Sequence, residues 1–463
     1  MLRETRYVTA LRAVALCVAM GLSLSPSHAK ERPPDPFPDP RPVAQDVPVF
    51  VAPEKPPRAD DAEQPAQPEP AEPLALQDAL ALALMRNAEL EMFSWDVRSS
   101  EARTLQAGKF PNPQLDFRVY RLGIPRVSAD PDDSRSRVIL SQVLQIGGKR
   151  RREVLVRQAE DQLAGWDYEA KRIEVATTVT GHFVAVLGAQ RRVESNRRLV
   201  EYLEQMRDRV MTLVETGAMR ALEMHQVTRQ VGMTRIDLQR AKSQLAVARF
   251  RLAATWSNQS PRFTEAVGDL EQVVTVPDID IVIELAQSSP AIARWDAEFE
   301  RGQAAVALAK SRRVPDITVG AGMRWQDNID ARDYLVDVEI GLPIFDRKQG
   351  EIREAQFNMS RAKAAKESAE AMSRELIAEF YYQMTESRGV SLTMAEEVVP
   401  SALAAVESLG RAVDVEPDRL GDLLDARRDL ARAEIDYTEA LVDYHQALAG
   451  LEGIIGHSLS GTD

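Results

Sequence analysis

The chain has 463 residues, of which 44% are hydrophobic, 28% charged and 6% aromatic, so it is long enough and apolar enough to fold into about two to four domains. It carries 58 Lys and Arg against 71 Asp and Glu, a formal net charge of -13, and this balance gives no sign of the basic face typical of nucleic-acid-binding proteins. The single cysteine, Cys17, excludes an internal disulfide framework and a multi-cysteine zinc site. We therefore expect no nucleic-acid partner and no redox chemistry.

The first 29 residues have the pattern of a secretory signal peptide. Three arginines precede an apolar stretch at 13–24, and small residues follow at 25–29. The apolar stretch would reach only ~18 Å as a helix, short of the ~30 Å hydrocarbon core of a membrane. Cys17 lies inside the stretch, which does not fit a lipoprotein signal. We predict cleavage before Lys30, which leaves a mature chain with a net charge of -15.

Residues 30–73 form a proline-rich leader. Residues 31–73 contain 14 of the 26 prolines, mixed with Asp, Glu, Gln and Ala. Proline lacks the backbone donor and favours extended, solvated chain. We expect a disordered leader or linker here, with a docking strip for the cell wall or a partner as the alternative.

The remaining sequence contains an internal repeat. When the chain is shifted against itself by 202 positions, Pro113 aligns with Pro315 and the surrounding residue types match. In each copy the pattern predicts a helix, two short strands, a very long helix, a turn and a second long helix, so we expect two copies of one ~200-residue unit. The predicted parts are a first repeat at 74–275, a second repeat at 276–456 and a tail at 457–463.

Long helices dominate both copies. From Leu420 to Ile455, apolar residues recur at alternating steps of three and four, the spacing of a coiled coil. The stretch from Lys149 to Glu215 contains no proline and would extend ~100 Å if it were helical throughout. The sequence therefore predicts a rod of packed helices rather than a compact globule.

Four short segments, one pair in each copy, have the alternating pattern of strands. They lie at about 113–121, 136–144, 316–325 and 333–343. In the last of them, Val336, Val338 and Ile340 alternate with Asp337 and Glu339, so one face would be apolar and the other polar.

Strands of about ten residues with alternating hydrophobicity are typical of an outer-membrane barrel wall, and a soluble four-stranded sheet is the alternative. In a barrel the three apolar residues would face lipid and the two carboxylates the lumen. Four strands cannot close a barrel around a lumen, and an open edge cannot lie in lipid, so several chains must then contribute strands. Three chains would supply twelve.

The sequence resembles the TolC-type outer-membrane factors, or outer membrane efflux proteins, over about Leu74 to Gly456. The resemblance depends on the repeated element order and on four motifs, which are Phe110-Pro111-Asn112-Pro113, Leu144-Gln145-Ile146-Gly147-Gly148-Lys149-Arg150, Gly341-Leu342-Pro343-Ile344-Phe345-Asp346-Arg347-Lys348-Gln349-Gly350 and Leu423-Leu424-Asp425-Ala426-Arg427. The strand-exit motifs are most similar to the CzcC and CusC branch, which serves heavy-metal cation efflux.

The resemblance implies a mostly α fold with a small membrane β part. It implies a homotrimer in the outer membrane of a Gram-negative bacterium, in contact with outer-membrane lipid. Its twelve-stranded barrel would continue into a large periplasmic coiled-coil barrel. The implied partners are a periplasmic adaptor, or membrane fusion protein, and an inner-membrane pump of the RND type. The alternatives are a drug-efflux or type I secretion duct of the same fold, and a periplasmic coiled-coil scaffold that transports nothing.

Two glycines mark the expected turns between long helices. Gly217 and Gly410 each lie about one rod length from the strands, and we expect both at the periplasmic tip, where an adaptor would dock. Close to the second turn, Asp414, Asp418 and Asp422 could form an acidic ring that favours cations, as acidic residues close this end in the family. The alternative is a solvated helix start, where acidic residues favour the helix dipole.

No catalytic or cofactor-binding motif is present in the sequence. The four histidines after residue 29 are scattered without the spacing of a metal site, and the Gly147-Gly148-Lys149 segment lacks the rest of a phosphate-binding loop. We interpret these glycines as a strand-to-helix turn. We expect neither an enzyme nor a tight metal site, and we expect cofactors to be absent.

Overall fold

The computed structural model describes residues 48–55, 73–120, 135–258, 260–274, 276–326, 331–413, 416 and 419–459. All of them belong to one compact unit, Arg41–Asp463. The predicted signal peptide lies outside the described residues.

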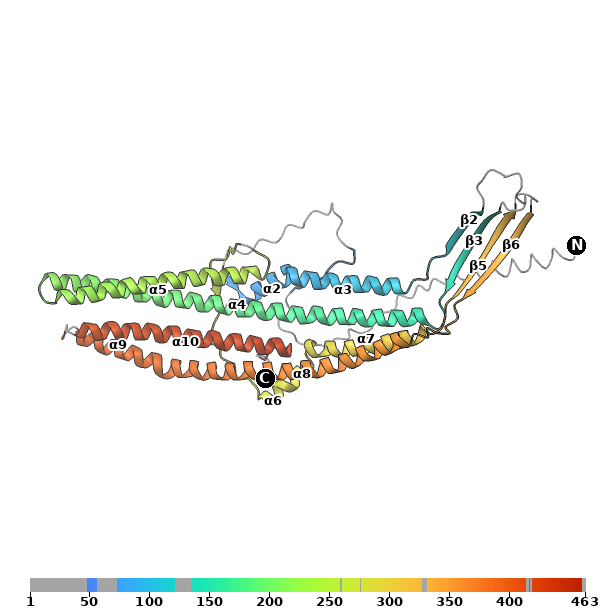
Figure 1. Cartoon of the computed structure of the whole chain (residues 1–463). Coiled ribbons are helices and arrows are strands. Elements are labelled where there is room, and N and C mark those ends of the chain that lie inside the picture. Colours follow the sequence, from blue (N-terminus) through green and yellow to red (C-terminus); the bar gives the residue numbers. More distant parts are fainter. Residues whose placement is uncertain are drawn as a thin grey trace. The chain divides into compact units, whose positions relative to one another are not determined.

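Each half of the chain contains a shorter helix, two strands and two long helices, in that order (Figure 1). In the first half these are α3 (Ala88–Ala107), β2 (Gln114–Tyr120), β3 (Arg135–Leu144), α4 (Lys149–Glu215) and α5 (Ala221–Ala254). In the second half they are α7 (Pro290–Ser311), β5 (Ile317–Gln326), β6 (Ala331–Ile340), α8 (Gln349–Thr393), which continues through a π-helical turn (Met394–Val398) into α9 (Val399–Val413), and α10 (Leu420–Ile455). The short elements are β1 (Leu74–Ala75), α2 (Leu76–Arg86), β4 (Ala266–Val267) and α6 (Ile279–Ala286).

Helix α4 has the bounds that the sequence predicts. It begins directly after Gly147 and Gly148, which have φ angles of +74° and +71°. A side chain is strained in this region of φ, so the two glycines explain the sharp change from strand β3 into the helix. The predicted turn role of this segment is confirmed.

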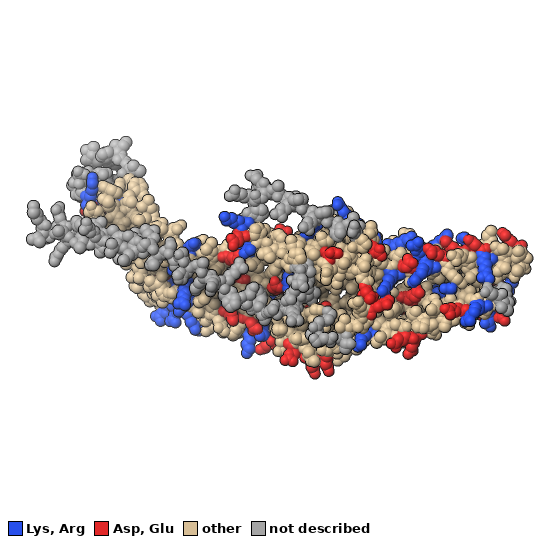
Figure 2. Space-filling view, turned by 180° about the vertical axis from the view of Figure 1, so that it is seen from behind, with Lys and Arg blue, Asp and Glu red and all other residues tan. Residues whose placement is uncertain are grey.

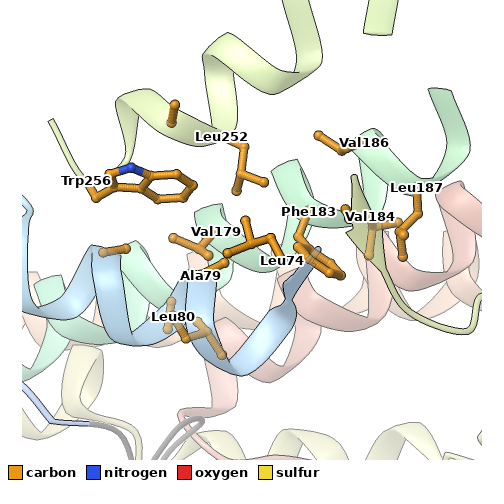
Figure 3. Close-up of a cluster of buried hydrophobic side chains, with 14 of the residues drawn as sticks. Leu74, Ala79, Leu80, Val179, Phe183, Val184, Val186, Leu187, Leu252 and Trp256 are labelled. Carbon is orange, nitrogen blue, oxygen red and sulfur yellow. The ribbon is translucent and has the colours of Figure 1, made fainter. Parts of the chain in front are cut away.

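The helices are held by three clusters of buried apolar side chains. The cluster in Figure 3 joins α2, α4 and α5 around the side chains of Leu74, Phe183 and Leu252, each at most 2% exposed. A second cluster joins α4, α5, α9 and α10 near the α4–α5 turn, and a third joins α6, α8 and α10. Each cluster therefore joins helices from different parts of the chain by burying apolar side chains between them.

The four longer strands form one antiparallel sheet in the order β2-β3-β5-β6. The middle pairing, β3 with β5, joins the two halves of the chain, with Leu140 opposite Ala321. The strand bounds agree with the prediction within a few residues. The largest difference is at the end of β6, at Ile340 instead of 343, where Pro343 has no backbone donor to continue a ladder.

Part of the predicted disordered leader is ordered, which corrects that expectation for residues 48–55, here called the N-terminal strap. The side chain of Ala52 is fully buried, and its N–H donates to the hydroxyl of Ser94 at 2.6 Å. Arg98 donates to the carbonyl of Ala52 at 2.6 Å, and Tyr168 donates to the carbonyl of Phe50 at 2.7 Å. Side chains of α3 and α4 thus satisfy backbone groups of the N-terminal strap, which belongs to no described strand.

Candidate channel wall and helix turns

One face of the four-stranded sheet is apolar and exposed. Its middle row crosses all four strands and consists of Leu115, Leu140, Ala321 and Val336. Val336 is 70% exposed, and on the same face Phe117 is 64% exposed. Val338 and Ile340 share this face with Val336, as the alternation predicts. A contiguous exposed apolar surface of this kind marks contact with lipid or with another protein.

The opposite face carries the charged side chains of the four strands, except Arg332. Asp116 forms ion pairs with Arg118 at 3.1 Å and Arg137 at 3.6 Å, and Arg324 pairs with Asp333 at 2.5 Å. Asp337 and Glu339 lie on this face as well, as predicted. The sheet therefore separates an oily face from an ion-paired polar face, which is the pattern of a barrel wall that borders water on one side.

Gly322 permits close packing on the polar face. A Cβ at Gly322 would lie 2.2 Å from the carbonyl oxygen of Val138 and 2.9 Å from the Cα of Ile139. Both are backbone atoms, which cannot move without distorting the strand. The position of the Ile139 side chain, which is 5% exposed, therefore requires a glycine in the neighbouring strand. This close approach was not recognised from the sequence.

The sheet has two unpaired edges. Among the described residues, β2 and β6 each pair with a single strand of this chain. An edge presents unpaired backbone N–H and C=O groups, which cannot be left unsatisfied in a hydrocarbon environment. A membrane-spanning form of this sheet therefore needs strands from further chains at both edges.

The α4–α5 turn has the expected glycine conformation. Gly217 has a φ of +72°, its N–H donates to the carbonyl of Val214, and the N–H of Ala218 donates to the carbonyl of Leu213 at 2.8 Å. This pair of hydrogen bonds is a Schellman motif, which ends a helix at a left-handed residue. The predicted turn at Gly217 is confirmed. At 1.5 Å per residue, α4 places this turn ~100 Å along the helix from the end of β3.

Gly410 is not a turn glycine, so that prediction is wrong. It lies inside α9, which continues to Val413. The glycine stays helical because neighbouring side chains of α9 pack into the second cluster, with Val406 and Val413 buried and Leu409 against it. Packing outweighs the cost of roughly 1 kcal/mol for glycine in a helix.

The three predicted gate residues are only partly described. Asp414 and Asp418 lie outside the described residues. Asp422 is exposed in the first turn of α10, between the buried side chains of Leu420 and Leu423. Its position fits both an acidic ring and a carboxylate that favours the positive end of the helix dipole.

The start of α10 is fixed by contacts that were not recognised from the sequence. Leu420, Leu423 and Leu424 are buried in the second cluster against α4 and α5. The guanidinium of Arg427 lies 4.0 Å from the ring centroid of Tyr202 in α4, a cation–π contact. The Leu-Leu-Asp-Ala-Arg motif thus anchors α10 to α4 and leaves Asp422 and Asp425 at the surface.

Two histidines are packed between helices. The imidazole Nε2 of His445 lies 2.9 Å from the carbonyl oxygen of Leu270, and burial lowers the pKa of His445 below 6.5. Burial also lowers the pKa of His182. Among the described residues, no group of three or more His, Cys, Asp or Glu side chains could hold a metal ion.

The helices α8 and α9 also expose apolar surface. By length and composition the run Gln349–Val413 contains an 18-residue stretch that could cross a membrane, but only 11% of that stretch is buried in this chain. Its exposed apolar side chains include Val390, Leu392 and Leu403. Such a surface on a rod-like helix is typical of an interface with a neighbouring chain.

Comparison with known proteins shows which family and which proteins this chain is similar to. The model of the family "Outer membrane efflux protein" matches residues 79–258 and 282–457. The cobalt-zinc-cadmium resistance protein CzcC of Cupriavidus metallidurans is 28% identical over 368 residues, which cover 78% of this chain and 85% of the relative. The nickel-cobalt-cadmium resistance protein NccC of Alcaligenes xylosoxydans xylosoxydans is 26% identical, over 62% of this chain and 64% of the relative.

Solved structures with the same fold include membrane channels. CusC has a TM-score of 0.70 at 15% identity, over 83% of this chain and 92% of its own. The open state of the MtrE channel of Neisseria gonorrhoeae has a TM-score of 0.69 at 16% identity, over 89% of this chain and 99% of its own. Together with the family match over most of the sequence, these similarities confirm the expected family: the chain belongs to the outer membrane efflux proteins.

Proposed function

We propose that the protein is the outer-membrane exit duct of a tripartite efflux system that exports heavy-metal cations. Three copies would assemble so that their sheets close a twelve-stranded barrel and their helices continue it as a coiled-coil tunnel in the periplasm. Each copy would contribute two duplicated units, in line with the element order shared by the two halves. The duct itself would be passive, since the substrate is selected elsewhere in the assembly.

The sheet is the observation that carries this proposal. Its apolar face is exposed and its other face is lined by ion pairs, and among the described residues β2 and β6 each have an outer edge without a partner strand. Strand β6 of one copy would pair with β2 of the next copy. The backbone N–H and C=O groups of every edge strand find partners only when the copies close into a ring. The apolar face would then contact lipid, and Asp337 and Glu339 would face the lumen.

The cargo is proposed from the relatives. CzcC and NccC are named for resistance to cobalt, zinc, nickel and cadmium, and the strand-exit motifs of this chain are similar to those of their branch. A duct must release its cargo, so weak electrostatic guidance suits the function better than tight coordination. An organic drug or a secreted protein, moved through the same fold, is the second candidate.

The turns would form the periplasmic end of the duct. A periplasmic adaptor would dock at the α4–α5 turn around Gly217 and at the segment that follows α9, and it would connect the duct to an inner-membrane pump of the RND type. Asp414, Asp418 and Asp422, repeated three times about the axis, would form the acidic gate. Replacing all three with Asn should change the cation preference of reconstituted channels while trimers still form.

Deletion of the gene tests the cargo. The deletion strain should become sensitive to zinc, cobalt, cadmium, copper or silver, and the wild-type gene should restore tolerance. If it lost resistance to organic drugs alone, the metal cargo would be wrong but the duct would stand. A protein that remained in the periplasmic fraction without detergent, and did not form trimers, would instead favour the coiled-coil scaffold.

A further inference from the structure

A cationic cavity of about 440 Å³ lies where the sheet meets the helices of the first half. It is bordered by the end of α3, the segment that leads into β2, the residue after β3 and the start of α4. Its charged lining consists of Arg103, Lys109, Arg150, Arg157 and a single carboxylate, Glu153. The cavity therefore has an excess of positive charge directly beside the membrane-spanning sheet of the proposed duct.

Arg103, Lys109 and Arg150 have no carboxylate partner among the residues that the structure describes. Arg157 is neutralised by Glu160 at 2.8 Å and by Glu153 at 3.5 Å. Among the described residues, neither Arg103 nor Lys109 forms an ion pair, and the guanidinium of Arg150 lies over the ring of Phe110 at 3.6 Å from its centroid. The first turn of α4 is entirely basic, Lys149 to Arg152, at the positive end of the helix dipole. An anion in the cavity would offset this concentration of positive charge.

The corresponding cavity of the second half is neutralised internally. It lies between the end of α7 and the start of α8 and is lined by Arg301 and Arg312 together with three glutamates. Arg301 pairs with Glu298 at 2.6 Å, and Arg312 pairs with Glu351 at 3.7 Å. The unpaired charge is thus a feature of the first cavity and is not required by the element order.

Apolar side chains continue from the cavity onto the exposed face of the sheet. Phe110, in the cavity wall, is 69% exposed, and Leu115 and Leu144, at the adjoining ends of β2 and β3, are exposed on the apolar face. Figure 2 shows Lys and Arg side chains where the helical part adjoins the sheet. Cations and an exposed aromatic ring beside a lipid-facing strand end form the combination that binds anionic headgroups at a membrane interface.

We propose that this cavity binds the phosphate headgroup of an anionic phospholipid in the periplasmic leaflet, with the acyl chains lying on the apolar face near Leu115 and Leu144. The inference rests on the proposed function, since it needs the sheet to span the membrane. Arg103, Lys109 and Arg150 would contact the phosphate, and Phe110 would mark the boundary between headgroup and acyl chains. One such site per chain would fix the depth of the duct in the membrane.

Native mass spectrometry of the detergent-purified protein tests the site, with phosphatidylglycerol and phosphatidylcholine of identical acyl chains as probes. The wild type should retain phosphatidylglycerol in preference, and the double variant Arg103→Gln, Arg150→Gln should weaken its binding by about 30-fold. The double variant Arg240→Gln, Arg432→Gln removes the same charge from exposed side chains of α5 and α10, and it should bind as the wild type does. If the first variant fails to fold, Lys109→Gln alone should weaken binding by about fivefold.

Equal retention of the two lipids by the wild type, or equal binding by cavity and control variants, would overturn the proposal. Complete release of phosphatidylglycerol by millimolar inorganic phosphate would overturn it as well, because the site would then bind free phosphate. Single-channel recordings on the same samples distinguish failure of the headgroup site from failure of the proposed duct. Channels that conduct without lipid preference refute the headgroup site alone, whereas a chain that needs no detergent and forms no channels refutes the duct and with it this site.

Discussion

The placement of the sheet in a membrane can be tested with a pair of adjacent substitutions, Val336→Arg and Asp337→Arg. Val336 is the sixth of the ten residues of β6, so it lies near the middle of the strand, and it is 70% exposed on the apolar face. Asp337 is its direct neighbour and points to the polar face. Both substitutions introduce the same side chain at adjacent positions on opposite faces, and Asp337→Arg also removes a carboxylate.

The expected difference is large. An arginine on the lipid face near the midplane of a barrel costs about 2 to 4 kcal/mol, which lowers the folding equilibrium by about 30- to 900-fold per chain. In a trimer the cost occurs three times. On the polar face the arginine would border water and lie on the same face as Glu339, so Asp337→Arg should cost less than about 1 kcal/mol.

The assay is the amount of heat-dissociable trimer in the outer-membrane fraction, together with urea titration of the protein refolded into vesicles. Val336→Arg should abolish or strongly reduce trimers, and Asp337→Arg should retain them. Equal tolerance of the two substitutions would refute the assignment of faces. A stronger effect of Asp337→Arg would mean that the apolar face is covered by protein and the polar face is the packed one.

Three further predictions concern the helical part. Gly217→Val should strain the α4–α5 turn by about 1 to 2 kcal/mol and abolish metal tolerance of the cells while trimers persist. Gly410→Ala, inside α9, should leave metal tolerance unchanged and raise the stability of the protein by about 0.5 to 1 kcal/mol. Equal loss of metal tolerance in the two variants would contradict this. Ser94→Ala leaves a buried N–H of the N-terminal strap unpaired, so it should lower the free energy of unfolding by about 1 to 3 kcal/mol and make the strap accessible to protease. Ser99→Ala changes an exposed serine on the same helix and should have neither effect. Because burial lowers the pKa of His445, the unfolded chain binds a proton at this residue more tightly than the folded chain, and the stability of the fold decreases as the pH drops below about 6.5. His445→Gln should therefore reduce the difference between the melting temperatures at about pH 7.5 and about pH 5.5. An unchanged difference would contradict a buried neutral imidazole.

The elements with strong local patterns were predictable from the sequence. The absence of proline from Lys149 to Glu215, with glycines before and after, predicts the bounds of α4, because proline and positive φ limit a helix wherever they occur. The strands and their two faces follow from alternation at a period of two, which holds whatever the strand packs against. The repeated element order and the four motifs, three at strand ends and one at the start of the last helix, were sufficient to identify the family.

The tertiary structure decided the features that depend on distant contacts. A turn is expected at Gly410 because glycine often ends a helix, but the residue is helical, since Val406 and Val413 pack into the cluster formed with α4, α5 and α10. The N-terminal strap is ordered by side chains that lie 42 to 118 residues away in sequence, and a proline-rich composition contains no signal for such contacts.

The pairing of β3 with β5 and the cationic cavity also depend on contacts between residues that are distant in sequence. The cavity draws its charges from α3, from Lys109 and from α4, and the sequence does not show which of the many arginines lie within reach of a glutamate. Local spacing determined which residues are helical or extended in this protein and which faces are apolar. Long-range packing, in which burial free energy outweighs local preference, decided that Gly410 stays helical, which strands meet and which charges stay unpaired.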